Sequence, residues 1–356
     1  MDDVTVVIAT FNSERTLPLT LESIAKQNYP KELVHILVID GGSSDSTLEI
    51  AFKYNCTIIN NPLVGPAHAK HLGLINTHSK YLVYLDHDEV FTNFDSIQKK
   101  INVFNEYTNV KIVIGSGYKT PASTPSINYY LNEFGDPFSF YIYRLSKDYR
   151  YFLNKMKKLY PVTVNNIDCT VFNFKGVRKW PIIEHGAAGS MVNKEHYMHE
   201  FNKVKRSLQE AYHFQSVYFY YLMGTENSFL AISHNDVLLH YSAENIKSYL
   251  AKIKWRIMNN IFHRKSMGIT GYLSRESFNS ANISLIKKYF FIPYSILLLP
   301  CFFDSVYLSV TRRNFSYLIH TPLCIYTSSL IIIYSIKNMM GITEVMTSYD
   351  GKKKLH

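Results

Sequence analysis

Two aspartates separated by a single residue, Asp86 and Asp88, follow an apolar run at residues 81–85. Residues two apart in extended backbone point to the same side, so both carboxylates can face one ligand while His87 faces away. Hard divalent cations such as Mg²⁺ or Mn²⁺ prefer oxygen ligands and often bridge to a diphosphate. This DXD pair therefore indicates a metal-binding site that could neutralise a diphosphate leaving group, with a solvated acidic turn as the alternative.

A second polar cluster, at residues 40–47, follows an earlier apolar run. Gly41 and Gly42 allow a tight turn and the close approach of a ligand. The carboxylate of Asp40 can accept hydrogen bonds from a base or a ribose, as acidic residues do in nucleotide-binding sheets. For Asp45 we favour a simpler role, which is to cap the helix that begins near residue 46.

Two further polar stretches stand at similar positions. Residues 9–14 could frame a base and a ribose, although Asn12 and Ser13 could equally only cap the next helix. Residues 65–70 open another strand-to-helix turn. Lys70 would place a cation there, where a phosphate could lie, and a solvated helix lysine is the alternative.

The elements that must position these clusters follow from the hydrophobic pattern. Short apolar runs alternate with segments of helical periodicity over about the first 115 residues. This alternation predicts an α/β fold with a mostly parallel, doubly wound sheet, whose ligands bind beyond the carboxyl ends of the strands. The pattern is irregular at about 116–180, where prolines interrupt it, and long helices are predicted at 204–223 and 243–262.

Charge and cysteine usage limit the partners. The 38 basic and 28 acidic residues give a formal net charge of +10, which could attract nucleic acid, anionic lipid or a phosphorylated substrate. We find no zinc-finger spacing, clear helix-turn-helix or RNP-like motif, so we expect no nucleic-acid partner and favour membrane lipid. The four cysteines form no CxxC pair, and the N-terminal residues lack the charge order of a signal peptide, which fits a reduced, cytoplasm-facing location.

Two apolar segments near the C-terminus, at 289–310 and 315–336, are each about long enough to cross a bilayer. A spanning hairpin would put Arg312 and Arg313 on the far side, against the positive-inside tendency, and prolines and Asp304 also interrupt the segments. We therefore favour two helices in the membrane interface over a spanning hairpin, with core helices of a soluble domain as the remaining alternative.

Taken together, these stretches resemble the family 2 glycosyltransferases, which have the GT-A fold. The resemblance runs from Thr5 to about Glu89 and consists of four motifs in the right order and spacing. They are the stretches at 9–14, 40–47, 65–73 and 84–88, with Ser23, Gln27, Tyr29 and Pro30 between the first two.

The resemblance implies a nucleotide-sugar donor and a role for each matching residue. Ala9, Phe11 and Glu14 would line the nucleotide pocket, and Asp40 would contact the base. Lys70 stands where the family usually has arginine, and would contact the diphosphate or the base.

Asp86 would then face the donor sugar or ribose, and Asp88 would bind Mg²⁺ or Mn²⁺. Members of this family invert the anomeric centre, with a carboxylate base that removes the acceptor proton. Many relatives carry that base in a Glu-Asp pair, which this chain lacks in the corresponding region. Glu210 is our first candidate for the base and His213 the second, while the pair at 184–185 could be the base or an acceptor contact.

The C-terminal part is more loosely similar to bacterial and archaeal members that act on lipid-linked or surface glycans. A His240-Tyr241 pair, a basic aromatic helix and the apolar tail carry this similarity. It implies an acceptor held at the membrane, such as a polyprenyl-linked saccharide.

We therefore expect a GT-A domain at 1–262, with a nucleotide-sugar-binding half at 1–115 and an acceptor-binding half at 116–262. Residues 263–356 would attach it to the cytoplasmic face of the membrane. Two alternatives stay open. One is a polyprenyl-phosphate glycosyl synthase, and the other is a catalytically degenerate scaffold for glycan assembly.

Overall fold

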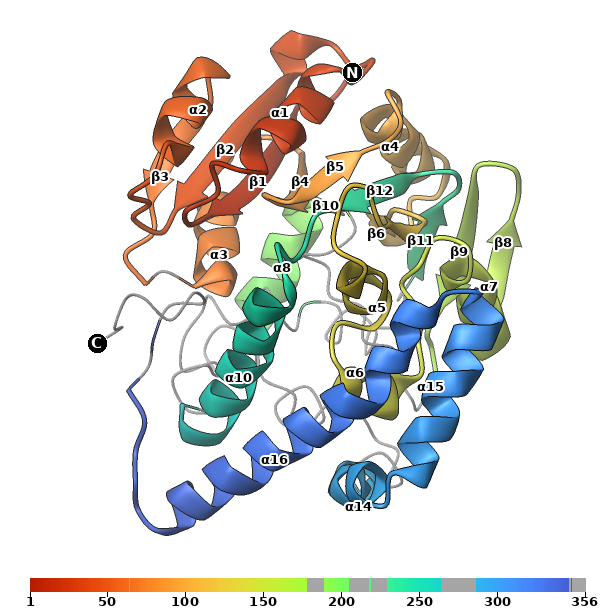
Figure 1. Ribbon diagram of the computed structural model, residues 1–356. Helices are drawn as coiled ribbons and strands as arrows, with labels where there is room; N and C mark the ends of the chain where they lie inside the picture. The colour runs from red at the N-terminus through yellow and green to blue at the C-terminus, as the bar shows by residue number, and fades with distance from the viewer. Residues whose placement is uncertain are drawn as a thin grey trace. The chain divides into compact units, whose positions relative to one another are not determined.

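The computed structural model describes residues 1–63, 65–177, 189–204, 218, 229–263, 286–345 and 347 of the 356-residue chain (Figure 1). Within them the chain forms two compact units. The N-terminal unit holds Met1–Lys119, Asp148–Val177 and the described part of Ile183–His240. The helical unit holds Thr120–Lys147 and the described part of Tyr241–His356. The functional division at residues 115 and 262 stays a prediction.

A large sheet forms the centre of the N-terminal unit. Among the described residues it has nine strands, and β9 and β10 are antiparallel to the other seven. The predicted α/β class and mostly parallel sheet are therefore confirmed. In spatial order they are β3 (Thr57–Asn60), β2 (Val34–Asp40), β1 (Val4–Thr10), β4 (Tyr81–Asp86), β10 (Ser190–Asn193), β6 (Val110–Ile114), β11 (Phe229–Ser233), β9 (Cys169–Asn173) and β8 (Val162–Asn165).

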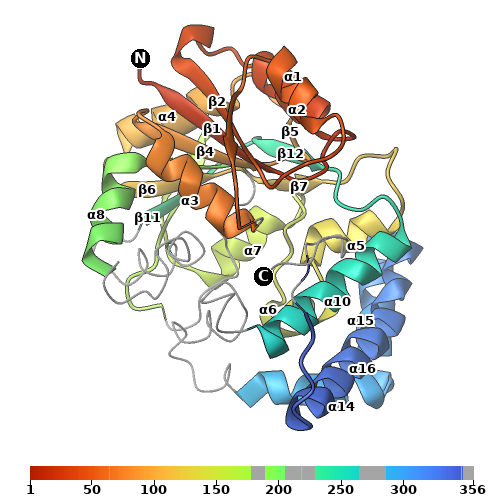
Figure 2. The ribbon, with the colours of Figure 1, turned by 90° about the vertical axis from the view of Figure 1, so that its left-hand side faces the viewer.

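Helices cover both faces of this sheet, which is why β1 and β4 are apolar at nearly every position. Alternate residues of β1, such as Val6 and Ile8, pack with α1 and α4, while Val7 faces α3 on the other side. Figure 2 shows α3 and α8 together on that second face. The helices of this unit are α1 (Leu17–Ala25), α2 (Thr47–Lys53), α3 (Pro66–Asn76), α4 (Ser96–Glu106), α7 (Phe152–Leu159) and α8 (Lys194–Val204), with a 3-10 turn at Lys31–Leu33.

A second, small sheet continues from the end of β4. Its described strands, in spatial order, are β5 (Glu89–Phe91), β12 (Val237–His240) and β7 (Gly117–Lys119). Glu89 pairs with His240 across β5 and β12, and Leu238 pairs with Tyr118 across β12 and β7. The small sheet thus fixes the residues that follow the Asp86-His87-Asp88 turn against two distant parts of the chain.

Residues 116–180, which the sequence pattern left irregular, form several helices and strands. The prolines mark the borders of these elements. Pro125 comes shortly before α5 (Ile127–Phe134), Pro137 is the first residue of α6 (Pro137–Tyr143), and Pro161 lies between α7 and β8. Proline suits the first turn of a helix because its missing N–H needs no partner there, so these residues start or separate elements without breaking them.

The helical unit packs α5 and α6 with the C-terminal helices around two apolar clusters. Its other helices are α10 (Ile246–Phe262), α14 (Phe291–Ile296), α15 (Leu299–Arg312) and α16 (His320–Met339), with 3-10 turns at Lys288–Phe290 and Phe315–Ile319. The segment expected to be one apolar stretch at 289–310 is bent by 87° between α14 and α15. Pro300 lies in the first turn of α15, and Leu298 before it has a φ of +60°.

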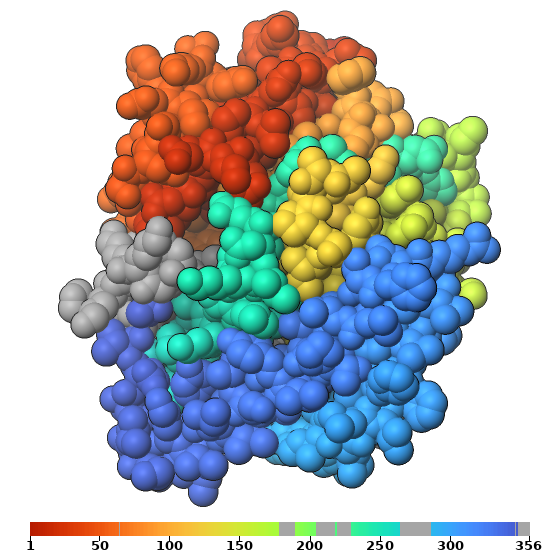
Figure 3. All heavy atoms as spheres, viewed as in Figure 1, coloured from red at the N-terminus to blue at the C-terminus, as the bar shows by residue number. Residues whose placement is uncertain are grey.

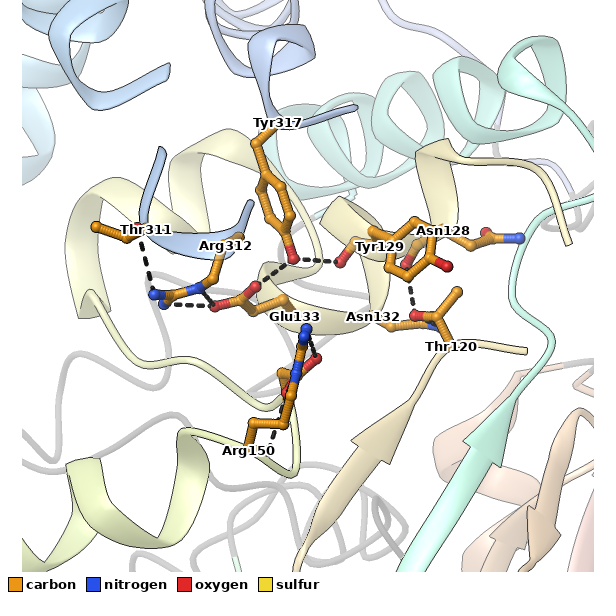
Figure 4. A network of polar contacts seen from close by, with 10 residues as sticks. Thr120, Asn128, Tyr129, Asn132, Glu133, Arg150, Thr311, Arg312 and Tyr317 are labelled. Atoms are coloured by element: carbon orange, nitrogen blue, oxygen red, sulfur yellow. Dashed lines mark hydrogen bonds and ion pairs between the residues drawn. The ribbon is translucent and has the colours of Figure 1, made fainter. Parts of the chain in front are cut away.

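A buried ion pair ties α5 to α15 in this unit. Nε and Nη2 of Arg312 donate to one oxygen of Glu133 at 2.9 and 2.8 Å, and the hydroxyl of Tyr317 donates to the other oxygen. The Glu133 side chain has no exposed surface, and Figure 4 shows it between Arg312 and Tyr317. Each carboxylate oxygen therefore has a donor, which is what makes its burial tolerable.

The close approach of α3 to β1 depends on Gly73, because a Cβ at this position would overlap the side chain of Val7. We expect Gly73→Ala to lower the free energy of unfolding by about 1–3 kcal/mol in a urea titration. Val7→Ala should make room for the new methyl group. The free energy of unfolding of the double variant should therefore be higher, by about 0.5 kcal/mol or more, than the value expected from adding the two single effects.

Gly65→Ala is the control for this prediction, since a carbon added there meets nothing closer than 3.8 Å. Strictly additive effects of Gly73→Ala and Val7→Ala would contradict the proposed contact.

Candidate active site

The aspartates singled out from the sequence lie at one edge of the large sheet. Thr10, the last residue of β1, pairs with Asp40 at the end of β2, and Ala9 pairs with Asp86 at the end of β4. Neighbouring strands are about 4.8 Å apart, so Asp40 and Asp86 flank β1 at its carboxyl end. The structure brings the two residues together, and their ligand roles remain predictions.

Asp40 holds the turn that follows β2. Its two oxygens accept hydrogen bonds from the hydroxyls of Thr10 (2.9 Å) and Ser43 (2.6 Å) and from the backbone N–H groups of Gly42 (2.9 Å) and Ser43 (2.8 Å). Gly42 has a φ of +86°, which favours glycine at this turn. A carboxylate has about four acceptor positions, so a nucleotide base would have to share or replace one of these partners.

The loop after β1 is fastened to the loop after β2. The N–H of Asn12 donates to the Ser43 hydroxyl at 2.8 Å, and the Asn12 side chain accepts the N–H of Ser44 at 2.9 Å. The Glu14 carboxylate accepts the N–H of Ser46 at 3.0 Å. Ala9, near the end of β1, and Phe11, on the first loop, are both half-buried. These hydrogen bonds hold the two loops together at the rim of the predicted nucleotide pocket.

Asp45 lies beside the same rim. It accepts the N–H of Thr47, the first residue of α2, at 3.1 Å, while the N-cap residue itself is Ser46, one position after the predicted Asp45. Partial burial opposes its ionised form, but hydrogen bonds from Thr47 and from the backbone N–H of Glu14 outweigh this effect and lower the pKa of Asp45.

Lys70 and Asp86 form an ion pair at the edge of the sheet. Nζ of Lys70, on α3, lies 2.9 Å from Oδ1 of Asp86, and the two side chains are 10% and 40% exposed. The cation is thus mostly buried while its partner still reaches solvent. A diphosphate bound at this edge would meet an ammonium group that is already held in place.

Asp88 faces His240, at the end of β12. Nε2 of His240 lies 3.6 Å from Oδ2 of Asp88, too far for a hydrogen bond but close to the spacing of neighbouring ligands around one small cation, about 3 Å in octahedral coordination. The described residues contain no group of three or more His, Cys, Asp or Glu side chains suited to a metal. Asp88 alone would supply the carboxylate by which Mg²⁺ or Mn²⁺ is usually held, with water and substrate phosphates completing the coordination, while an imidazole ligand such as His240 is less usual for these cations.

Glu89 and Tyr118 were not singled out from the sequence. Glu89 is fully buried, and its carboxylate accepts the N–H of Asp86 at 3.2 Å and is hydrogen-bonded by the Tyr118 hydroxyl. Burial, together with the negative charges of Asp86 and Asp88, raises the pKa of Glu89 to about 8. The signal in the sequence was an acid at the first position of a strand that is otherwise apolar.

His87 points away from this cluster. Its Nδ1 lies 2.9 Å from the hydroxyl of Thr16, just before α1, while its carbonyl accepts the hydroxyl of Thr20. The candidate bases Glu210 and His213, the pair at 184–185 and all of the helix predicted at 204–223 except residues 204 and 218 lie outside the described residues.

The chain is similar to several glycosyltransferases. Residues 5–180 match the family described as Glycosyl transferase family 2. The poly(ribitol-phosphate) beta-N-acetylglucosaminyltransferase TarS of Staphylococcus aureus is 25% identical over 115 residues, which are 31% of this chain and 20% of the relative. The UDP-Glc:alpha-D-GlcNAc-diphosphoundecaprenol beta-1,3-glucosyltransferase WfaP of Escherichia coli is 30% identical over 142 residues, 36% of this chain and 55% of the relative.

Among solved structures, the mannosyltransferase PcManGT from Pyrobaculum calidifontis, in complex with GDP-Man and Mn²⁺, has a TM-score of 0.48 at 12% identity and covers 96% of this chain and 90% of its own. The alignments with TarS and WfaP span a fifth to about half of those relatives' length. Through residues 5–180, which contain most of the site described above, the chain belongs to glycosyl transferase family 2.

Proposed function

We propose that this protein is an inverting glycosyltransferase that moves a sugar from a nucleoside-diphosphate sugar to a hydroxyl of a lipid-linked or cell-surface glycan. The observation that carries the proposal is the grouping of Asp86, Asp88 and Lys70, all within the family 2 segment, beyond the carboxyl ends of parallel strands, with His240 facing Asp88. The names of TarS and WfaP support a nucleotide-sugar donor and a glycan acceptor, and both are part of the proposal for this chain.

The transfer needs one bond to form as another breaks. The acceptor oxygen attacks the anomeric carbon, the bond from that carbon to the diphosphate breaks, and a base takes the acceptor proton. Asp88 and His240 would hold Mg²⁺ or Mn²⁺, which when bound neutralises charge on the diphosphate. Lys70 stabilises the same leaving group from α3, and Asp86 orients both Lys70 and the donor sugar.

Asp88→Asn tests this function directly. The variant keeps the size of the side chain but removes the charge that the cation needs, so we expect sugar transfer to fall by about 100-fold or more. Release of nucleoside diphosphate from UDP-GlcNAc or GDP-mannose, with a mixed glycan acceptor and Mn²⁺, measures it, and circular dichroism confirms that the fold is kept.

Asp168→Asn, on the exposed loop between β8 and β9, is the matched control and should retain full activity. Undiminished transfer by Asp88→Asn in the presence of a chelator would show that the proposal is wrong.

The proposal also includes attachment to the cytoplasmic face of a membrane, through the helical unit. In α15 the exposed side chains are large and apolar and recur on one face of the helix: Phe302, Phe303, Val306, Tyr307 and Val310. The buried side is smaller and more polar, with Cys301, Ser305, Leu308 and Ser309. This is the reverse of a helix on a soluble protein, and it resembles helices whose surroundings are lipid.

Polar groups inside this unit are paired with one another. Asp304, the acid on α15, accepts from Nη1 of Arg144 at 2.7 Å and from the hydroxyl of Tyr294 at 2.5 Å. Tyr294 also contacts Nε2 of His320 at 2.8 Å, whose Nδ1 lies 2.6 Å from the hydroxyl of Tyr130. The acid that seemed to interrupt the apolar segment therefore points into the unit and adds no charge to the apolar face.

The basic residues near α15 also support a membrane surface. Arg312 is neutralised by Glu133, so the Arg312-Arg313 pair is not the double charge that the sequence suggested. Lys287 and Lys288 lie before α14, and Arg313 is exposed after α15. Such residues at the ends of an apolar surface would meet anionic headgroups. Figure 3 shows the C-terminal helices, in blue, as one continuous surface.

In the described part of the chain one helix, Phe315–Met339, is long and apolar enough to cross a membrane, and the bent pair α14–α15 could count as a second. The bend of 87° and the exposed face of α15 support shallow insertion in the plane of the membrane, as favoured from the sequence.

Substitutions on α15 test this attachment without removing the helices. Truncation after residue 285 would also remove Leu308, Tyr317 and Leu323 from the core of the helical unit. A loss of membrane binding could then result from unfolding of this unit. We expect Phe303→Asp and Val310→Asp each to weaken sedimentation with anionic phospholipid vesicles by about 10-fold or more, because burying a large apolar side chain is worth about 1.5–3 kcal/mol.

The control is Phe52→Asp, which removes a side chain that is 77% exposed on α2 in the N-terminal unit. If all three variants bind vesicles as the parent protein does, α15 is not the attachment surface.

A further inference from the structure

Glu89 connects the backbone of the metal-site turn to a tyrosine from another strand. Its side chain lies in the interior of the N-terminal unit, one residue after Asp88. One carboxylate oxygen accepts the backbone N–H of Asp86 at 3.2 Å, which holds the end of β4. The other oxygen is hydrogen-bonded by the hydroxyl of Tyr118, on β7.

Tyr118 in turn supports the imidazole of His240. The two ring centroids are 4.6 Å apart, with an angle of 33° between the ring planes. His240 is also the cross-strand partner of Glu89, and Leu238, two residues earlier on β12, pairs with Tyr118. The imidazole is therefore held from two sides, by backbone pairing to β5 and by the face of a tyrosine ring.

We propose that Glu89 and Tyr118 are positioning residues, which orient His240 and the Asp86–Asp88 turn for the divalent cation. This inference rests on the proposed function, because it assumes that Asp88 and His240 bind the cation. Neither residue needs to touch the cation or the substrate. Groups that fix the orientation of metal ligands in this way commonly change metal affinity or activity by about 10–100-fold when they are replaced.

Two conservative substitutions separate positioning from bulk packing. Tyr118→Phe keeps the ring that lies against His240 and removes only the hydroxyl that anchors it to Glu89. Glu89→Gln keeps the size of the side chain but replaces one of its two acceptor oxygens with a donor. In both variants the imidazole loses part of its support while the apolar core is left intact.

We expect Mn²⁺ to bind both variants about 10-fold more weakly than the parent protein, in the presence of UDP or GDP. Electron paramagnetic resonance of free Mn²⁺, titrated into the full chain, measures this without any turnover. In the transfer assay the Mn²⁺ concentration for half-maximal activity should rise by a similar factor. The rate at saturating Mn²⁺ should change less than about 3-fold, whereas general damage to the fold would lower it.

Tyr29→Phe is the matched control. This buried tyrosine also loses a hydroxyl with a defined partner, because Tyr29 donates to the carbonyl of Asp2 at 2.6 Å, at the amino end of β1, whereas the site lies at the carboxyl end of that strand. Its Mn²⁺ affinity should equal that of the parent protein.

The outcomes distinguish the two proposals. If the parent protein binds Mn²⁺ no better than Asp88→Asn does, the metal site itself is wrong, and the positioning role is wrong with it. If the parent protein binds Mn²⁺ and Tyr118→Phe and Glu89→Gln bind it equally well, or if Tyr29→Phe is weakened as much as they are, only the positioning role is overturned.

Discussion

The crowding of three carboxyl groups at the end of β4 is the constraint on which the site depends. Asp86, Asp88 and Glu89 stand within four consecutive positions, and Glu89 is fully buried. Burial and the negative charges of Asp86 and Asp88 raise the pKa of Glu89, so its ionised form is disfavoured. Groups from three distant elements contact these side chains: Lys70 of α3 pairs with Asp86, Tyr118 of β7 hydrogen-bonds Glu89, and His240 of β12 faces Asp88. The packing of these elements and the electrostatics of the site therefore depend on each other.

The helical unit handles its charges differently. The buried Glu133 pairs with Arg312 and accepts the hydroxyl of Tyr317, and Asp304 pairs with Arg144 and accepts the hydroxyl of Tyr294. The apolar side chains that a soluble helix would bury lie on the outside of α15. The proposed membrane attachment would account for both features, because polar groups in apolar surroundings must find partners within the protein.

Much of the N-terminal unit could be predicted from the sequence, because its strands are buried on both faces and give continuous apolar runs. The runs that end before residues 10, 40 and 86 correspond to β1, β2 and β4. The elements between residues 116 and 180 could not be predicted in the same way. Their prolines lie at the borders of helices and strands, where they interrupt the hydrophobic periodicity from which such elements are predicted.

The site was predicted only in part, and the reason is distance along the chain. Asp86 and Asp88 are local to one strand end, so their spacing was informative. His240 was noticed only as half of a His-Tyr pair, and Tyr118 carried no signal, because their roles come from pairing across β5, β12 and β7. Hydrophobic periodicity cannot show which residues more than 100 positions apart become neighbours in a sheet.

The small sheet also sets the order in which the protein can mature. Its three strands are drawn from residues 89–91, 117–119 and 237–240, and β12 lies between the other two. A nascent chain in which residue 240 has not yet been synthesised can pair β1, β2 and β4, but it still lacks β12, which carries His240. The proposed cation site would therefore be completed only after β12 has joined the sheet, and closing contacts between residues so far apart is a slow kind of folding step.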